Sequence, residues 1–250
     1  MKIVPVVTQK GGVGKTTVSF NLAKAAADVF KLRAAVIDLD GQANLSISLT
    51  GNLDIKHTYE GGADGLFRDG PFPKATKTSH GIDLFHGHAQ IDRIDNDEEI
   101  YDRALSIELR DRLRKLPYDV IIVDTPPAIG LRHMAPLYWA NTVVIPMEPN
   151  SDALLGAQDT VAAIKMASRI NKGVKWVAVL NKIKKSSTSH KEAIQWVHSQ
   201  FADELAAEFG DRVAVADSRD QDEPQAVWQY RGSPRALREQ WLDFCKKVLG

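Results

Sequence analysis

The chain has 250 residues, 32 basic and 32 acidic side chains, and a single cysteine, Cys245. This length is enough for one substantial domain with a large buried core, so we expect a single domain over residues 1–250. The balanced charge excludes a strong overall field toward nucleic acid or an anionic membrane, and any such partner must be met by a local patch. One cysteine excludes an internal disulfide, an iron–sulfur cluster and a thiolate zinc site, and it fits a reducing cytoplasm. No stretch reaches the roughly 20 apolar residues that a membrane span needs, so we predict a cytoplasmic protein without signal peptide or transmembrane helix.

Short β-branched runs alternate with helical periods along the whole chain. Strands are predicted at 3–8, 34–38, 82–85, 120–124, 142–146, 174–180 and 213–216, and helices near 16–29, 98–116, 132–140, 151–170, 187–208 and 234–249. This alternation predicts an α/β fold with a mostly parallel, twisted sheet and helices on both faces. The stretch 50–77 contains seven glycines and prolines and is predicted to be an irregular insertion.

A glycine-rich loop follows the first predicted strand and leads directly into a helical pattern. Its residues are Gln9, Lys10, Gly11, Gly12, Val13, Gly14, Lys15, Thr16 and Thr17. Glycines let the backbone amides surround phosphate oxygens, and the helix N-terminus adds positive charge. In such a loop Lys15 lies against the β- and γ-phosphates, and the Thr16 hydroxyl binds Mg²⁺. Gln9 stands where the ordinary P-loop has glycine, and the additional Lys10 fits the deviant Walker A form. The alternative is a glycine turn with incidental lysines.

Three carboxylates follow two of the predicted strands. Asp38 and Asp40 stand at the end of one, and Asp124 ends another. Each by itself is often a helix cap or turn former. Beside a phosphate loop, they favour a site for Mg²⁺, which prefers oxygen ligands, with Asp124 acting through a water and Asp38 nearby. Asp40 is the candidate that orients the attacking water.

These motifs resemble the ParA/MinD family of deviant Walker A P-loop ATPases, and ParA-type partition ATPases most closely. Residues 10–21 match the phosphate loop and its helix, 38–44 are similar to switch I, and 124–128 are similar to switch II. The loop begins nine residues from the first residue, so we expect the short type without an N-terminal helix-turn-helix. The resemblance implies ATP and Mg²⁺ as cofactors and an ATP-dependent homodimer, in which Lys10 reaches the partner's phosphates.

The same resemblance carries a nucleotide-base contact to Asn181. The segment Asn181-Lys-Ile-Lys184 lacks the aspartate that accepts from guanine, which favours ATP over GTP. The family commonly has an Ile-Pro-Arg stretch along the adenine, whereas residues 215–219 here read Val-Ala-Asp-Ser-Arg. The adenine contacts in that stretch therefore stay open.

One segment departs from the neutral balance. Between residues 167 and 200 there are seven Lys or Arg side chains and one acid, Glu192. Lysines mixed with hydroxyls suit phosphate contacts without base reading, although a lysine-rich loop is often only a solvated surface. By the resemblance we predict nonspecific DNA contacts; the candidate residues are Lys182, Lys184, Lys185, Lys191 and Arg235.

The resemblance thus implies a slow ATPase that a ParB-type or other adaptor stimulates, that associates with the nucleoid in its ATP state, and that positions DNA or another large cargo. Two other classes stay open. A MinD-like membrane ATPase would use the apolar stripe of the last predicted helix, but the acids Glu239 and Asp243 on that helix argue against membrane binding. An ATP-dependent small-molecule enzyme on the same scaffold would need a substrate pocket, which the 50–77 stretch would have to supply.

Overall fold

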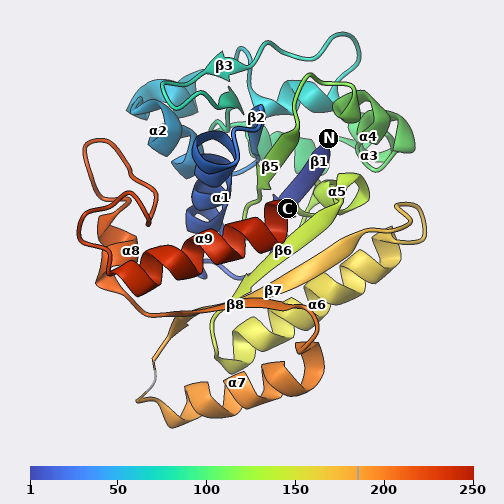
Figure 1. Ribbon diagram of the computed structural model, residues 1–250. Coiled ribbons are helices and arrows are strands. Elements are labelled where there is room, and N and C mark those ends of the chain that lie inside the picture. Colours follow the sequence, from blue (N-terminus) through green and yellow to red (C-terminus); the bar gives the residue numbers. More distant parts are fainter. Residues whose placement is uncertain (185) are drawn as a thin grey trace.

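The computed structural model describes residues 1–184 and 186–250, with the side chains of residues 151–153 left aside. Within this part of the chain, eight strands form one sheet in the order β3-β4-β2-β5-β1-β6-β7-β8 (Figure 1). The strands are β1 (Lys2–Val6), β2 (Ala34–Asp38), β3 (Thr76–Lys77), β4 (Asp83–Phe85), β5 (Val120–Asp124), β6 (Thr142–Met147), β7 (Lys175–Ile183) and β8 (Leu205–Gly210). All neighbours pair in parallel except β3 with β4. The predicted fold class is confirmed.

Helices cover both faces of this sheet (Figure 1). The α-helices are α1 (Lys15–Lys24), α2 (Asn44–Thr50), α3 (Glu98–Ala104), α4 (Ile107–Arg114), α5 (Leu131–Trp139), α6 (Ser151–Ala167), α7 (Thr188–Phe201), α8 (Val213–Asp217) and α9 (Arg235–Leu249). A π-helical turn, η1 (Ala25–Val29), extends α1, and short 3₁₀ turns are η2 (Leu53–His57), η3 (Ala63–Phe67) and η4 (Ile91–Asn96).

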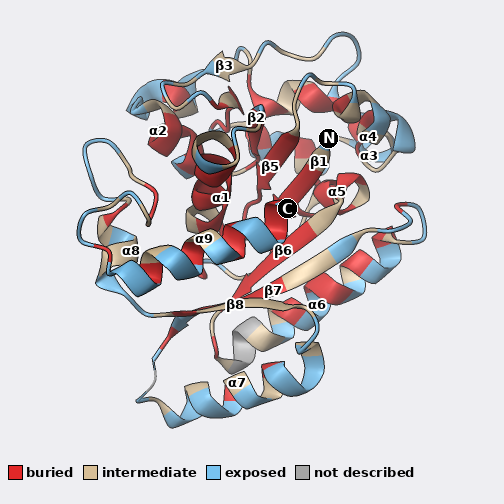
Figure 2. Cartoon of the chain, in the orientation of Figure 1, coloured by how far each residue is buried: buried red, intermediate tan, exposed pale blue. Residues whose placement is uncertain are grey.

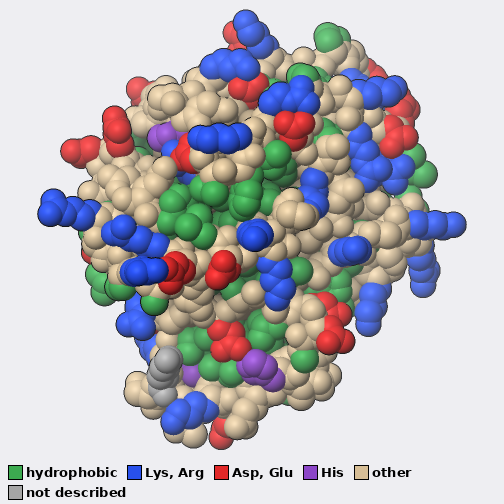
Figure 3. All heavy atoms as spheres, in the orientation of Figure 1, with side chains coloured by type: hydrophobic (Ala, Val, Ile, Leu, Met, Phe, Trp, Pro, Cys, Tyr) green, Lys and Arg blue, Asp and Glu red, His purple; other side chains and the backbone are tan. Residues whose placement is uncertain are grey.

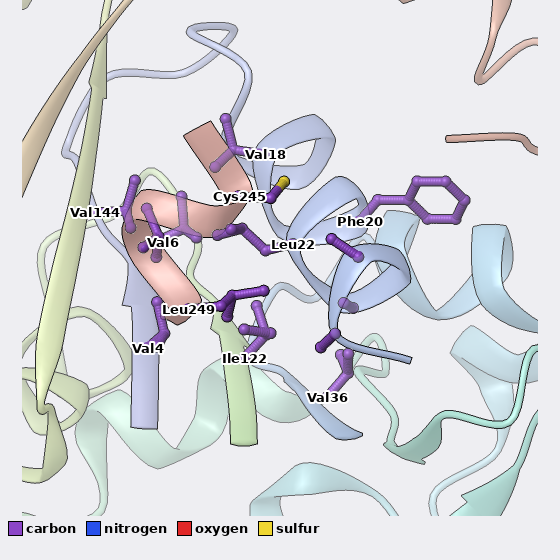
Figure 4. Close-up of a cluster of buried hydrophobic side chains, with 14 of the residues drawn as sticks. Val4, Val6, Val18, Phe20, Leu22, Val36, Ile122, Val144, Cys245 and Leu249 are labelled. Atoms are coloured by element: carbon purple, nitrogen blue, oxygen red, sulfur yellow. The ribbon is translucent and has the colours of Figure 1, made fainter. Parts of the chain in front are cut away.

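Alternate side chains of the central strands enter different hydrophobic cores. Val4 and Val36 pack beneath α1 and α9, where Figure 4 shows them with Leu22 and Cys245. Their neighbours Ile3 and Ile37 point to the opposite face, toward α5. Because both faces are buried, as Figure 2 shows, these strands read as continuous apolar runs in the sequence.

The predicted strand at 213–216 was wrong, and so was the end of the helix predicted over 187–208. Val213 begins the short helix α8, and the last strand is β8, Leu205–Gly210, which pairs with β7. The β8 sequence, Leu-Ala-Ala-Glu-Phe-Gly, is rich in helix-forming residues. Its pairing along β7 and the complete burial of Phe209 override that preference.

Two further predictions need correction. The helix predicted over 98–116 is two helices, because Ser106 caps α4 by accepting the Leu109 amide through its hydroxyl at 3.1 Å. The 50–77 stretch contains η2, η3 and β3, and it contributes buried side chains such as Phe67 to the core. The 50–77 stretch is therefore part of the folded core rather than an irregular insertion.

The last helix, α9, crosses the view of Figure 1 between α1 and β8 and contacts both. Its apolar stripe is buried in the core: Leu237, Trp241, Phe244, Cys245 and Val248. Among the described residues, no helix combines the length and apolar character that crossing a membrane requires.

Candidate functional site

The phosphate loop joins the carboxyl end of β1 to α1. Gly12 and Gly14 take positive φ angles of 78° and 98°, a conformation that glycine adopts without strain. A side chain at Gly14 would place its Cβ 2.4 Å from the Asn181 amide nitrogen. The loop thus requires glycine at 14 for both conformation and space, and it presents the start of α1 to the cleft.

The predicted loop residues surround one cleft of about 310 Å³. It is lined by Gly11, Gly12, Gly14, Lys15, Thr16, Thr17, Asp40, Asn44 and Pro127. The Lys15 side chain is 7% exposed, and its ammonium donates to the Lys10 carbonyl at 2.8 Å. Burial lowers the Lys15 pKa, and the nearby carboxylates of Asp124 and Asp40 offset part of this effect. A buried ammonium held between carboxylates and a glycine loop suits the binding of a polyanion.

Asp38 and Asp124 lie side by side, because β2 and β5 pair with these two residues in register. Asp38 accepts the Ser46 hydroxyl at 2.6 Å and the Ser46 amide at 2.9 Å on one oxygen, and the Asp40 amide at 3.1 Å on the other. Burial, and then the charge of Asp124, raise the pKa of Asp38 above its ordinary value. Both oxygens of Asp38 are thus engaged, and this carboxylate holds switch I in place.

Asp124 has an oxygen to spare. Its Oδ1 accepts the Ser19 hydroxyl at 2.9 Å, whereas Oδ2 is buried and finds no hydrogen-bond partner among the described residues. Burial raises the Asp124 pKa, and the hydroxyls of Thr16 and Ser19 lower it part of the way back. An orphaned carboxylate oxygen beside Thr16 fits Mg²⁺ or one of its waters, since this cation takes oxygen ligands and keeps part of its hydration. Of the predicted metal residues, Thr16 and Asp124 are the better placed.

Asn181 lies on the far side of the loop from Asp124. Its amide nitrogen donates to the Val13 carbonyl at 2.9 Å, and it borders a hollow of about 140 Å³ that Gly14 and Thr17 also line. Val215, Ala216 and Arg219 form the opposite wall of this hollow. The structure therefore brings the open 215–219 stretch next to the predicted base contact.

Two lysines near the loop have distinct placements. The Lys10 ammonium extends to the Asn150 side-chain oxygen at 3.0 Å, ahead of α6. Lys182 forms an ion pair with Glu148 at 2.9 Å and also donates to the Gly12 carbonyl. These contacts tie the Lys182 ammonium to the phosphate loop, although its side chain is 45% exposed, and its contact with DNA stays a prediction.

The other predicted DNA contacts that the structure describes are Lys184, Lys191 and Arg235, at the end of β7 and the starts of α7 and α9. Lys184 is well exposed, with its ammonium 3.9 Å from Asp211, and Lys191 is exposed. Arg235 pairs with Glu239 one turn further along α9 at 2.7 Å. Lys185 lies outside the described residues. Figure 3 shows Lys and Arg side chains gathered over α8 and the amino-terminal end of α9.

The sequence reasoning missed residues that support the site from a distance. Ser46 holds Asp38, and Arg219 donates to the Thr16 carbonyl at 3.1 Å and to the Ser48 hydroxyl. Arg219 is half-buried, and desolvation of its guanidinium lowers its pKa to about 10. Its guanidinium stacks over Phe20 at 4.5 Å. No local sequence pattern predicts these contacts. The one available signal is the arginine itself, which follows a short apolar run and could have been tested as a supporting residue.

Fold and cleft together define a P-loop nucleotide-binding protein, and the comparisons narrow this class. The sequence model of a family described as "AAA domain" matches residues 1–176. The chain is 31% identical to the chromosome-partitioning ATPase Soj of Treponema pallidum, over 66% of this chain and 64% of that protein. It is 30% identical to the chromosome partitioning protein ParA of Myxococcus xanthus, over 72% of this chain and 64% of that protein. Its fold is similar to that of Cyanothece McdA in complex with ATP, with a TM-score of 0.85 at 18% identity, covering 100% and 96% of the two chains.

The chain belongs to the ParA/MinD family of P-loop ATPases and resembles the ParA-type partition proteins within it. The predicted family is confirmed. The residues of the cleft fit the expected cofactors, ATP and Mg²⁺: the glycine loop and Lys15 for the phosphates, and Thr16 with the spare oxygen of Asp124 for the cation.

Proposed function

We propose that this protein is a ParA-like switch: it dimerises with ATP and Mg²⁺, binds DNA without sequence preference in that state, and releases it after hydrolysis. Its cargo is DNA or another large assembly. The main support for the proposal is that the two lysines of the loop, Lys10 and Lys15, have different positions. Lys15 lies within the cleft, whereas Lys10 extends away from it toward Asn150 and is not among the residues that line it. A second cation at the rim is suited to the phosphates of a facing subunit, where negative charges accumulate.

Within one subunit, Lys15 neutralises charge that develops on the β- and γ-phosphates, and Asp40 orients the attacking water. Mg²⁺, held through Thr16 and Asp124, supplies further charge neutralisation. The base is seated between Asn181 and the 215–219 stretch. We propose that hydrolysis is slow until a ParB-type or other adaptor completes the geometry, because a positioning switch requires a long-lived ATP state.

DNA contacts in this proposal come from Lys184, Lys185, Lys191 and Arg235, with the nucleoid as the site of the ATP-bound dimer. Lys184 and Lys191 keep exposed ammonium groups at neighbouring ends of β7 and α7, which supports phosphate contacts without base reading.

The test is binding of the purified protein to random-sequence duplex DNA with ATP, ADP or no nucleotide, across a salt series. Binding should need ATP and weaken steeply with salt. A Lys184→Glu/Lys191→Glu variant should lose at least about tenfold in affinity and show a shallower salt dependence. The matched control, Lys172→Glu/Lys175→Glu, reverses two exposed charges at the opposite end of β7 and should bind almost as the parent does.

Equal losses in both variants would show a general charge effect and remove the assigned patch. Binding to anionic liposomes in place of DNA would move the protein to the MinD-like class. ATP turnover that depends on a metabolite, with neither surface bound, would favour the small-molecule enzyme.

A further inference from the structure

One buried ion pair connects α5, which follows switch II, to the 3₁₀ turn η4. Arg132, in the first turn of α5, pairs with Asp95 of η4: its NH2 group lies 2.7 Å from Oδ2, and its Nε lies 2.9 Å from the same oxygen. The two side chains are 7% and 15% exposed. A pair removed from water to this degree has a fixed geometry and is screened only weakly by salt.

Asp95 also fixes where α5 begins. Its Oδ1 accepts the Arg132 backbone amide at 2.9 Å, so one carboxylate holds both the backbone and the side chain of the same residue. A Cβ at Gly130 would lie 2.6 Å from this carboxyl group, so only glycine allows the approach. Because α5 follows directly after the 124–128 segment, this contact anchors the end of switch II.

The guanidinium reaches switch I with its remaining amino group. Arg132 NH1 donates to the Leu39 carbonyl at 3.2 Å. Leu39 stands between Asp38 and Asp40 and is itself fully buried, and its amide donates to the Asp124 carbonyl at 2.9 Å. The peptide group that connects Leu39 to Asp40 is therefore held from the α5 side.

The hollow next to the nucleotide cleft has this guanidinium in its wall. It measures about 350 Å³ and is bordered by Asp40 and Gln42 of switch I, by Pro126 and Pro127 of switch II, and by Arg132. The arginine thus stands where the two switch segments face each other, without lining the cleft for the phosphates.

We propose that Arg132, fixed by Asp95, is a positioning residue that couples switch II to switch I and sets the direction of the Asp40 carboxylate. This inference deepens the proposed ATPase function and rests on it for its kinetic consequence. Its structural consequence, the restraint of residues 39–44, is independent of turnover. The two parts are therefore tested separately.

The first test is amide hydrogen exchange on the nucleotide-free protein. Arg132→Gln should speed exchange at least about tenfold in residues 39–44 and 125–131, because the bonds that the guanidinium donates to the Asp95 carboxylate and to the Leu39 carbonyl are lost together. The matched control is Arg103→Gln, since Arg103 likewise donates to a carboxylate, Asp69, and to a backbone carbonyl, Phe67, but lines neither the nucleotide cleft nor the adjoining hollow. Unchanged exchange in the Arg132 variant, or the same change in the control, overturns the proposal.

The second test separates binding from turnover. Arg132→Gln should lower kcat by about 10- to 100-fold, as expected for a displaced catalytic group, while KM and the affinity for a fluorescent ATP analogue stay within about twofold. Arg132→Lys, which keeps the charge but reaches fewer acceptors, should fall between the parent and the glutamine variant. A parallel loss of ATP binding, or a kcat equal to that of Arg103→Gln, contradicts a positioning role.

Removal of a buried charge can also unfold the protein. A second substitution therefore distinguishes loss of positioning from unfolding. Asp95→Asn keeps an oxygen that can accept the Arg132 amide but removes the charge that fixes the guanidinium. It should reproduce the kcat loss in a protein whose thermal melting is still cooperative, and a fully active Asp95→Asn variant would sink the proposal. If the parent protein hydrolyses no ATP, the proposed function fails, and the exchange experiment still decides on the restraint.

Discussion

Asp40 lines the nucleotide cleft, and its Oδ1 accepts the Gln42 amide at 3.0 Å. The carboxylate is half-buried, whereas those of Asp38 and Asp124 are buried, and in the proposed function it orients the attacking water. Asp40→Ala should therefore lower ATP turnover by about 100-fold or more and leave ATP binding intact. Phosphate release and binding of a fluorescent ATP analogue measure the two effects.

The control for Asp40 is Asp92→Ala, which removes a carboxylate from the wall of the adjoining hollow. It should keep nearly full turnover. Strong hydrolysis by the Asp40 variant would remove the role assigned to this residue.

His133 is a second residue with a measurable signature. It is buried, neither ring nitrogen has a hydrogen-bond partner among the described residues, and burial together with the Lys15 charge lowers its pKa from 6.5 to about 4. The His133 imidazole is therefore protonated near pH 6.5 in the unfolded chain, but only near pH 4 in the folded protein. Folding stability is lost as pH falls through this window, and above pH 6.5 the effect vanishes.

Between pH 7.5 and 5.5 this histidine should account for about 1 kcal/mol of lost stability. His133→Leu should remove that part of the pH dependence, as measured by urea denaturation at the two pH values. His57→Leu is the control, because His57 is exposed. An unchanged pH dependence in the His133 variant would mean that its ring finds a partner or is reached by water.

At the residue scale, sequence reasoning found the groups that lie next to one another along the chain. The phosphate loop and the two strand-end aspartates follow local rules, and parallel pairing then brings Asp38 next to Asp124. Arg132, Asp95 and Arg219 were missed, because each contacts a group that is distant in the sequence. Lys182 is predicted to contact DNA from the local charge and the family resemblance, whereas its contact with Glu148 depends on how β6 and β7 end.

At the element scale, the central strands and long helices follow from hydrophobic periodicity, but the last strand does not. Leu205–Gly210 has no β-branched residue, and only the free edge of β7 makes it a strand. Val213–Asp217 has two valines among its five residues, yet it forms a helical turn. Propensity decides such short segments only where tertiary contacts do not.

The docking of α9 is the element contact with the clearest energetic consequence. Trp241 stacks on Phe209 of β8, with ring centroids 4.3 Å apart and planes 9° from parallel, and it is fully buried. Trp241→Ala should lower the free energy of unfolding by about 3–5 kcal/mol, as large cavities do. Urea denaturation measures the change.

A matched control for α9 is Trp241→Phe. The indole nitrogen has no hydrogen-bond partner among the described residues, so phenylalanine gives up no hydrogen bond and most of the ring contact remains. It should cost clearly less than the alanine variant. If both variants unfold like the parent, α9 is not docked as described, and its apolar stripe becomes available to a membrane.

At the scale of the whole molecule, charge and topology agree with a switch that acts through local surfaces. The chain is neutral overall. The nucleotide cleft lies at the carboxyl ends of β1, β2 and β5, where parallel sheets of this kind bind ligands. Asp40 of switch I and Pro127 of switch II border this one cleft. In the proposed function, a change at the γ-phosphate would therefore reach both segments and any surface that contacts them.

Dimerisation is a property of the whole molecule, and it tests the role proposed for Lys10. Lys10 contacts Asn150 rather than lining its own cleft, so Lys10→Ala should leave the affinity of the monomer for ATP within about twofold. Two facing nucleotides would then lack a cation between them, and ATP-dependent dimers should weaken by at least about tenfold, or about 1.4 kcal/mol. Sedimentation in the presence of a slowly hydrolysed ATP analogue measures the strength of the dimer.

Lys165→Ala, which removes an exposed ammonium from α6, is the control and should dimerise like the parent. Loss of ATP binding by the Lys10 variant would instead place this lysine on its own nucleotide, and unchanged dimers would remove the trans role altogether.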